Sequence, residues 1–213
     1  MSGGAPRIED PDPFSAQQAG GSPVRVAPER TALLVVDMVQ DFLDPGGAMP
    51  VADPGPVIEA NRRLAEAARE AGVTIVWVRP GHLDASDGLF RKRAVHGLRG
   101  TPGAGFPESL GMRPGERVLE KRRYSAFFAT DLDLWLRERE IGAVVVGGVA
   151  LNICVRSTVH DAFFLGYAVT VVPDACRATS DRERDSSLYD IATHFGELAS
   201  AQEVIAGWGS AID

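Results

Sequence analysis

The chain has few cysteines and no long apolar segment, and both absences narrow the classes of protein to consider. Two cysteines, Cys154 and Cys176, occur among 213 residues. Two thiols make no disulfide framework, so we expect a cytoplasmic protein with both thiols free. No apolar run is long enough to span a bilayer, and the N-terminus lacks the charged start and apolar core of a signal peptide, so no membrane partner is expected.

Basic residues are also in the minority. The chain has 22 Lys and Arg residues against 29 Asp and Glu residues, a formal net charge of −7. Proteins that bind nucleic acid usually need a basic patch, so this balance argues against such a partner. A composition with 45% hydrophobic and 24% charged residues is that of an ordinary globular protein, and the length suits one sizeable domain.

Two regions differ in composition. Residues 1–29 are rich in Gly, Pro and Ser and show no periodicity, so we predict a flexible N-terminal arm. Residues 30–213 are predicted to form the folded domain, because apolar runs typical of buried strands alternate there with segments of helical periodicity.

The order of these segments predicts the fold class. The predicted strands are TALLVVDM, VTIVWVRP, RVLEK, AVVVGGVA, AVTVVPDA and, closing the chain, AQEVIAG. The predicted helices are VIEANRRLAEAAREAG, TDLDLWLREREIG, NICVRSTVHDAFFLGY and SDRERDSSLYDIATHFGE. Gly72 is expected to end the first of these helices, and Thr130 to be the N-cap of the second. We therefore expect an α/β, three-layer Rossmann-like fold with a six-stranded, mainly parallel sheet and helices on both faces.

Three reactive side chains stand at predicted strand ends, where ligands bind in sheets of this kind. Asp37 ends the first strand, Lys121 ends RVLEK, and Cys154 opens a helix just after AVVVGGVA. A helix N-terminus and a nearby cation both lower a thiol pKa, and a carboxylate can take the thiol proton. Cys154 is therefore predicted to be a nucleophile, whereas Cys176, which has no glycine-rich approach, is predicted to be structural.

The GGVA segment before Cys154 supports the same chemistry. Glycines let backbone N–H groups approach a substrate closely, and such groups can hold the oxyanion of a tetrahedral intermediate. Together with a thiol, a cation and a carboxylate, they would complete an apparatus for acyl transfer through a thioester. The alternative for each residue alone is ordinary packing or capping.

At these residues the sequence resembles the isochorismatase-like cysteine hydrolases. The segments LLVVDMVQDF, KRRYSAFFATDLD and GGVALNICVRSTVHDAFFLGY match three signature blocks of that superfamily in order. The resemblance implies a catalytic triad of Asp37, Lys121 and Cys154, and an oxyanion hole formed by the amides of Ala150 and Cys154. It also implies a cis peptide bond before Ala150 and a homo-oligomer, a dimer or tetramer. Leu151 departs from the pattern, since many relatives have Thr there.

The retained cysteine favours a particular reaction within the superfamily. In the superfamily that this sequence resembles, isochorismatases that cleave a vinyl ether do not keep this cysteine. The resemblance therefore implies hydrolysis of a C–N bond in a small carboxamide or ureido substrate. Within the superfamily, the sequence looks most like the ureidoacrylate and N-carbamoyl amidohydrolase branches. The alternatives are a vinyl-ether hydrolase, a nicotinamidase-like amidase and a non-catalytic binding homologue. Nicotinamidases have an Asp–x–His metal site, but Pro80 takes the place of that Asp before His82. We predict no metal and no cofactor.

The segment between the second and third strands is expected to shape the substrate pocket. Arg91, Arg93 and His96 are candidates for binding a substrate carboxylate, for which arginine offers a bidentate fork. The other candidate substrate-binding residues are Phe42, His82, Tyr124 and Phe127, and Phe128 is a further possible pocket wall. For each aromatic residue, packing in the core is the competing interpretation.

Overall fold

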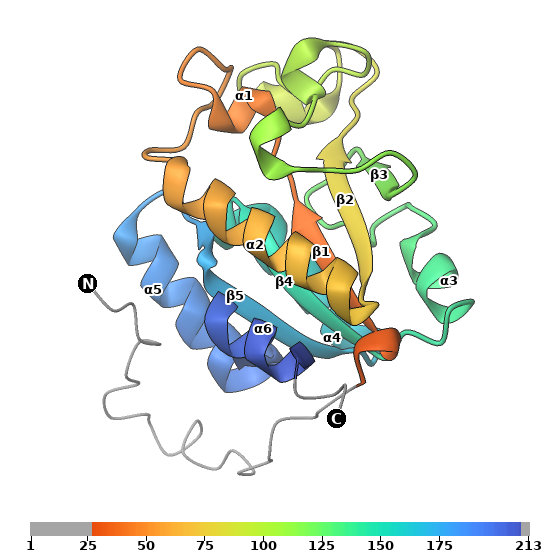
Figure 1. Ribbon diagram of the computed structural model, residues 1–213. Helices are drawn as coiled ribbons and strands as arrows, with labels where there is room; N and C mark the ends of the chain where they lie inside the picture. The colour runs from red at the N-terminus through yellow and green to blue at the C-terminus, as the bar shows by residue number, and fades with distance from the viewer. Residues whose placement is uncertain (1–26, 210–213) are drawn as a thin grey trace.

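The computed structural model describes residues 27–209, and within this range six strands form one sheet flanked by helices (Figure 1). The strands are β1 (Thr31–Val36), β2 (Thr74–Pro80), β3 (Arg117–Lys121), β4 (Ala143–Val149), β5 (Ala168–Arg177) and β6 (Glu197–Leu198). The helices are α1 (Gln40–Leu43), α2 (Gly55–Ala71), α3 (Leu132–Arg137), α4 (Arg156–Phe164), α5 (Asp181–Asp190) and α6 (Ala201–Gly209). Residues 1–26 of the predicted arm lie outside the described residues, and Pro28–Arg30 form a short 3-10 turn before β1.

The sheet has the strand order β3-β2-β1-β4-β5-β6, and every neighbouring pair is parallel. The chain thus places β2 and β3 on one side of β1 and then crosses to the other side, where β4, β5 and β6 follow. In sheets of this topology, ligands bind outside the carboxyl ends of the strands at the point where the order reverses, here between β1 and β4. The predicted Rossmann-like sheet is confirmed, and its strands are all parallel.

Two apolar cores hold the helices against the sheet. Successive side chains of a strand point to opposite faces, so Leu33 and Val35 pack in one core while Leu34 and Val36 pack in the other. In Figure 1, α2 and α6 cover the face turned toward the viewer, while residues of α3, α4 and α5 pack in the opposite core. No described helix has both the length and the apolar character needed to cross a membrane.

Helix α2 follows directly from its sequence pattern. Val57, Ala60, Leu64 and Ala68 recur at helical spacing and are all buried against the sheet. Gly72 caps the helix with a φ of 75°, a left-handed conformation that glycine adopts without a Cβ clash. Both the helix and its predicted end are confirmed.

The prediction for the last element is wrong. The segment AQEVIAG is helix α6, and the sixth strand is the two-residue β6 that precedes it. Ala201, Val204 and Trp208 are buried at helical spacing. The Ser200 hydroxyl accepts a hydrogen bond from the Glu203 N–H at 3.2 Å, and the Glu203 carboxylate accepts one from the Ser200 N–H at 2.7 Å. This capping box favours the helix, and its S-x-x-E pattern is present in the sequence.

The start of α3 also differs from the prediction. Its N-cap is Asp131 and not Thr130, and the Asp131 side chain makes no capping hydrogen bond. The Thr130 hydroxyl instead donates to the Ala126 carbonyl at 2.6 Å and accepts from the Leu132 N–H at 3.3 Å. Thr130 therefore fixes the turn that precedes the helix.

The helix predicted after AVVVGGVA begins irregularly. Leu151–Val155 form a π-helical turn, and α4 continues from it. Val155, Val159 and Ala162 are buried as predicted, but Phe163 is 44% exposed. The last turn of α4 therefore presents Phe163 and Phe164 to solvent.

Candidate active site

Asp37 lies at the carboxyl end of β1, and its backbone is fixed on both sides. Its N–H donates to the Val78 carbonyl at 2.8 Å, and its own carbonyl accepts from the Val39 N–H at 2.8 Å. Its φ of 54° is left-handed, a conformation that aspartate tolerates better than most residues. The side chain is only 1% exposed, so this carboxylate is held inside the protein.

Lys121 ends β3 and forms a buried ion pair with Asp37. Its Nζ donates to Asp37 Oδ2 at 2.7 Å and to the Arg123 carbonyl at 3.1 Å, and its side chain is 3% exposed. Burial opposes the charge of Lys121, but the Asp37 carboxylate outweighs it, so the pKa of Lys121 is raised. The ammonium is therefore charged throughout the neutral range.

Cys154 completes this group from the end of β4. It sits in the π-helical turn, is partly exposed and lines a cavity. Asp37 and Lys121 are both close enough to act electrostatically on its thiol. The structure therefore brings the three predicted residues together from three different strands.

The electrostatics of Cys154 correct the expectation of a lowered thiol pKa. Burial raises the pKa of Cys154 well above its usual range, and the nearby Lys121 ammonium only partly opposes this. The thiol is thus protonated near neutral pH, and it needs a base to become a thiolate.

One oxygen of Asp37 is available for that role. Oδ2 accepts from Lys121, whereas Oδ1 is buried and has no hydrogen-bond partner among the nitrogen and oxygen atoms of the described residues. A buried carboxylate oxygen without a donor is costly, so it is suited to accept a proton or a substrate N–H. The Cys154 thiol, on which Asp37 acts electrostatically, can supply that proton.

The glycines before Cys154 have a different role from the predicted one. A Cβ on Gly148, whose φ is 121°, would lie 2.0 Å from the Val36 carbonyl oxygen, and one on Gly147 would lie 2.6 Å from Asn61 Oδ1. These glycines therefore allow β4 to approach β1 and α2 closely, rather than allowing a substrate to approach. Buried Asn61 fixes the same region by donating to the Val57 and Ala175 carbonyls, both at 2.8 Å.

The backbone just after β4 offers hydrogen-bond donors beside the thiol. The Val149–Ala150 peptide bond is cis, as the resemblance implied. The Ala150 carbonyl accepts from the N–H groups of Ile153 and Val155, whereas the Cys154 N–H has no backbone acceptor outside its own turn within residues 27–209. N–H groups in the first turn of a helical segment are suited to binding a negative charge.

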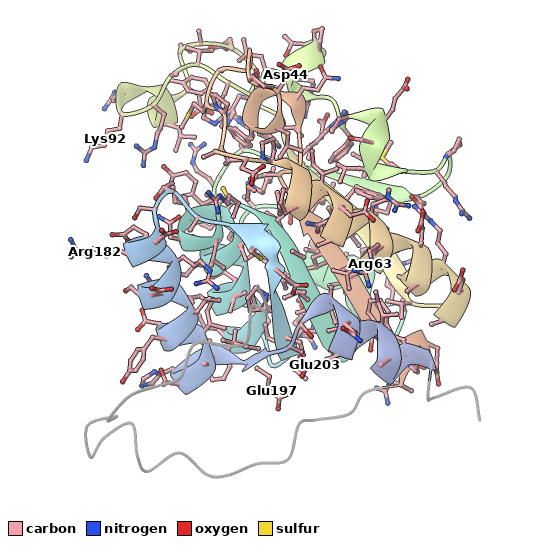
Figure 2. All side chains as sticks on the ribbon, turned by 60° about the vertical axis from the view of Figure 1, so that its left-hand side comes forward. Asp44, Arg63, Lys92, Arg182, Glu197 and Glu203 are labelled. Atoms are coloured by element: carbon pink, nitrogen blue, oxygen red, sulfur yellow. The ribbon has the colours of Figure 1, made fainter. Side chains whose placement is uncertain are left out.

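A cavity of about 510 Å³ opens above this cluster. Its floor includes Val149, Ala150, Ile153 and Cys154, and its walls come from the loops at the carboxyl ends of the strands. In Figure 2, Asp44 and Lys92 mark the end of the molecule that carries these loops, whereas Glu197 and Glu203 lie at the opposite end. The position agrees with the switch between β1 and β4.

Four of the seven predicted substrate-binding residues line the cavity, and three do not. Phe42, His96 and Tyr124 line it, together with Arg93. His82 is 2% exposed and is enclosed by other side chains, Arg91 is exposed on a 3-10 turn outside the cavity, and Phe127 is buried in the core against Tyr167. Phe128 is 58% exposed and also lies outside the cavity.

The sequence analysis missed the wall formed by the end of β5 and the start of α5. Arg177, Ala178, Thr179, Ser180, Asp181 and Arg184 all line the cavity. Within residues 27–209, neither Arg93 nor Arg177 forms a side-chain hydrogen bond or an ion pair. The rule about strand ends would have identified Arg177 had the strand not been predicted to stop at Ala175.

The histidines near the cavity do not form the metal site of the nicotinamidases. His82 Nδ1 donates to the Asp87 carboxylate at 3.1 Å, and His96 Nδ1 donates to the Ala94 carbonyl at 2.8 Å. Burial lowers the pKa of His82, so its ring is neutral at pH 7. Pro80 supplies no donor atom, and residues 27–209 contain no cluster of three or more His, Cys, Asp or Glu that could hold a metal ion. The absence of a metal stays a prediction.

Comparison with known proteins agrees with the fold. Residues 31–203 match the isochorismatase domain family. The chain belongs to the isochorismatase family. It is 37% identical over 202 residues to a ureidoacrylate amidohydrolase, RutB, of Cronobacter sakazakii, a match that covers 83% of this chain and 87% of the relative.

Solved structures of family members have the same fold. A cysteine hydrolase from Pseudomonas syringae pv. phaseolicola is 31% identical, with a TM-score of 0.82, and the match covers 88% of this chain and 96% of that one. The N-carbamoylsarcosine amidase of Thermoplasma acidophilum is 30% identical, with a TM-score of 0.72, and the match covers 82% and 98% of the two chains. The sequence-based assignment to this superfamily is confirmed.

Proposed function

We propose that the chain is a hydrolase that cleaves a C–N bond of a small carboxamide or ureido acid, with Cys154 as nucleophile. One observation carries the proposal: Cys154 lies at the floor of the cavity, and Asp37 and Lys121, which form a buried ion pair with a 2.7 Å contact, act on its thiol. The names of the relatives, ureidoacrylate amidohydrolase and N-carbamoylsarcosine amidase, support this reaction class.

In the first half of the reaction, Asp37 takes the thiol proton while the sulfur attacks the substrate carbonyl. Proton transfer accompanies attack because burial keeps the free thiol protonated. A C–S bond forms, and the carbonyl electron pair moves to an oxyanion held by the amides of Ala150 and Cys154. When the oxyanion collapses, the C–N bond breaks and Asp37 returns the proton to the leaving nitrogen, so that ammonia or an amine departs from a thioester.

In the second half, water attacks the thioester carbonyl while the same carboxylate removes its proton. Collapse of this second tetrahedral intermediate breaks the C–S bond, and the sulfur recovers the proton from Asp37. Lys121 keeps the carboxylate charged between proton transfers because it remains an ammonium beside Oδ2. All the steps use groups of this chain and water.

The cavity favours an anionic substrate. The chain as a whole has a net charge of −7, yet its cavity is lined by three arginines and one exposed acid, Asp181. Arg93 and Arg177 have guanidinium groups that no described residue neutralises. A local positive field in a cleft raises the concentration of anions there, and guanidinium binds carboxylate in a bidentate manner. Phe42 and Val51 give the same cavity an apolar side.

The proposal is tested by measuring ammonia release from a panel of compounds. The panel pairs carboxylate-bearing ureides and amides with their neutral methyl esters or amides of the same size. Turnover of the anionic members, with kcat/KM at least 10-fold above the neutral ones, is expected from a charge-assisted hydrogen bond of about 1.5–3 kcal/mol. Absence of turnover across the whole panel, with hydrolysis of a vinyl ether instead, would contradict it.

Replacing Arg177 with glutamine is expected to raise KM for anionic substrates about 10- to 100-fold, because one charged partner of the carboxylate is lost. KM for neutral amides should change by less than about 3-fold, and steady-state kinetics on both substrate types separates the two effects. Arg182, which projects outward from α5 and lies outside the cavity (Figure 2), offers the matched control Arg182→Gln. Equal changes in KM for the two variants would assign Arg177 no role in binding.

A further inference from the structure

The buried hydroxyl of Thr158 connects the turn that carries Cys154 with a second segment of the chain. Thr158 lies on α4 and is 0% exposed. Its Oγ1 donates to the Cys154 carbonyl at 2.7 Å and accepts from the Ala126 N–H at 3.0 Å. Cys154 follows β4, whereas Ala126 belongs to the segment after β3, so one side chain joins the backbones that leave two different strands.

Ala126 is an anchor point of the segment after β3. It is completely buried, and threonine hydroxyls bind both of its backbone groups. Its N–H donates to Thr158 Oγ1, and its carbonyl accepts from the Thr130 hydroxyl at 2.6 Å. The Thr130 bond stays within the segment, whereas the Thr158 bond reaches α4. The hydroxyl of Thr158 therefore helps to fix how the segment lies relative to the turn of Cys154.

The same segment also holds the ammonium of the buried ion pair. Lys121 Nζ donates to Asp37 Oδ2 at 2.7 Å and to the Arg123 carbonyl at 3.1 Å. Arg123 and Ala126 belong to one short stretch of chain, in which the first supplies a carbonyl to the ammonium and the second supplies an N–H to Thr158. Thr158 is thus connected on one side to the residue that bears the thiol and on the other side to the segment that holds the cation.

We propose that Thr158 is a positioning residue that sets where the Cys154 sulfur lies relative to the Asp37–Lys121 pair. The inference rests on the proposed function, in which Asp37 takes the thiol proton as the sulfur attacks. Thr158 itself touches no substrate, because it is buried and does not line the cavity. It acts through the Cys154 carbonyl, and a displacement of reacting groups by about 1 Å can lower a rate about 100-fold.

The contact with the distant segment is what separates Thr158 from an ordinary helical threonine. Threonine hydroxyls in helices often bind the carbonyl four residues earlier, and that bond alone would indicate no function. Thr193 shows the same bond, since its Oγ1 donates to the Tyr189 carbonyl at 2.7 Å in a buried position outside the cavity. Thr158 adds a bond to Ala126, 32 residues earlier in the chain. Thr193 therefore offers a matched control.

Thr158→Val tests the inference, because valine keeps the shape of threonine and lacks the hydroxyl. It should lower kcat about 10- to 100-fold and change KM by less than about 3-fold, since the residues that line the cavity are retained. Thr158→Ser keeps the hydroxyl and should retain kcat within about 3-fold of the wild type. Ammonia release from a substrate found in the panel gives both constants, and urea denaturation gives the folded fraction of each variant.

Thr193→Val separates positioning from stability. It also loses a buried hydroxyl bond, so it should unfold at a lower urea concentration than the wild type, but its folded fraction should keep normal kcat. Equal kcat for the folded fractions of Thr158→Val and Thr193→Val would overturn the proposal. If Thr158→Val does not fold, Thr158→Ala removes the same hydroxyl and should show the same loss of kcat. Failure of both to fold would make Thr158 purely structural and would also overturn the proposal.

Cys154→Ala distinguishes failure of this inference from failure of the proposed function. Turnover that persists in Cys154→Ala would refute the nucleophile and, with it, the role of Thr158. An inactive Cys154→Ala together with wild-type kcat in Thr158→Val would leave the nucleophile in place and overturn only the positioning role. An equal loss of kcat in Thr158→Val and Thr158→Ser would overturn it as well, since the retained hydroxyl would then make no difference.

Discussion

Replacing Cys154 with alanine is expected to lower kcat by at least about 10⁴-fold, with the protein still folded. The thiol forms the only covalent bond to the substrate in the proposed reaction, and removal of a nucleophile that acts together with its base costs the enzyme nearly all of its rate enhancement. Ammonia release measured under substrate saturation reports kcat directly. Turnover within 10-fold of the wild type would show that water or another group attacks the substrate.

Cys176→Ala is the matched control for this prediction. Cys176 belongs to β5, is 8% exposed and packs in the core shared with α4 and α5, and burial raises the pKa of its thiol to about 12. It does not line the cavity. Its replacement should lower the free energy of unfolding by about 1 kcal/mol, a typical cost for a small core change, and leave kcat unchanged.

Breaking the buried ion pair is expected to have the second-largest effect. Lys121→Met leaves the Asp37 carboxylate buried without its cation, which should lower the free energy of unfolding by about 3–5 kcal/mol and remove activity. Asp37→Asn/Lys121→Met replaces the pair with neutral groups and should recover most of the stability, because neither charge is then left alone. The double variant should stay inactive, since no base remains to take the thiol proton. Urea denaturation and ammonia release measure the two effects separately.

Arg69→Met is a control that separates stability from catalysis. Arg69 pairs with Glu116 at 2.6 Å, with both side chains at most 15% exposed, and neither residue lines the cavity. Its loss should also destabilise the protein, but the folded fraction should retain normal kcat. If Lys121→Met behaved in the same way, with its activity lost only through unfolding, the pair would be structural rather than catalytic.

The strands and their polar ends were predictable from sequence because their signals are local. Continuous apolar runs identify strands buried on both faces, and parallel strands place their carboxyl ends along one edge, so the sequence alone is enough to group Asp37, Lys121 and Cys154. The helix α6 was missed for the same local reason, because a short apolar run fits a strand or a helix equally well. In that case the pattern from Ser200 to Glu203 contained the deciding information.

The cavity wall was harder to predict because it depends on contacts between distant segments. Phe127 and Phe128 are adjacent, yet the first is 8% exposed in the core and the second is 58% exposed and lies outside the cavity. His82 and His96 both belong to the segment after β2, but the ring of His82 turns inward to Asp87 and only His96 reaches the cavity. Neither composition nor spacing distinguishes such neighbours, since the difference arises from how the loops fold over the sheet.

The pKa of the Cys154 thiol was also hard to predict from the sequence. A helix start and a lysine at a strand end predicted a lowered pKa for Cys154, but sequence does not report how deeply the sulfur is buried. In the structure, burial outweighs the lysine and raises the pKa. In the proposed reaction the proton must therefore leave as the sulfur attacks, which makes Asp37 as important as the thiol itself.

Intact-mass spectrometry of acid-quenched enzyme tests the covalent mechanism most directly. During turnover of a substrate found in the panel, a fraction of the wild type should gain the mass of the acyl group, the substrate without its leaving amine, and peptide mapping should place this mass on Cys154. Cys176→Ala should give the same adduct and Cys154→Ala none. Product formed in a single turnover with no adduct at any quench time, or an adduct that persists in Cys154→Ala, would contradict the account.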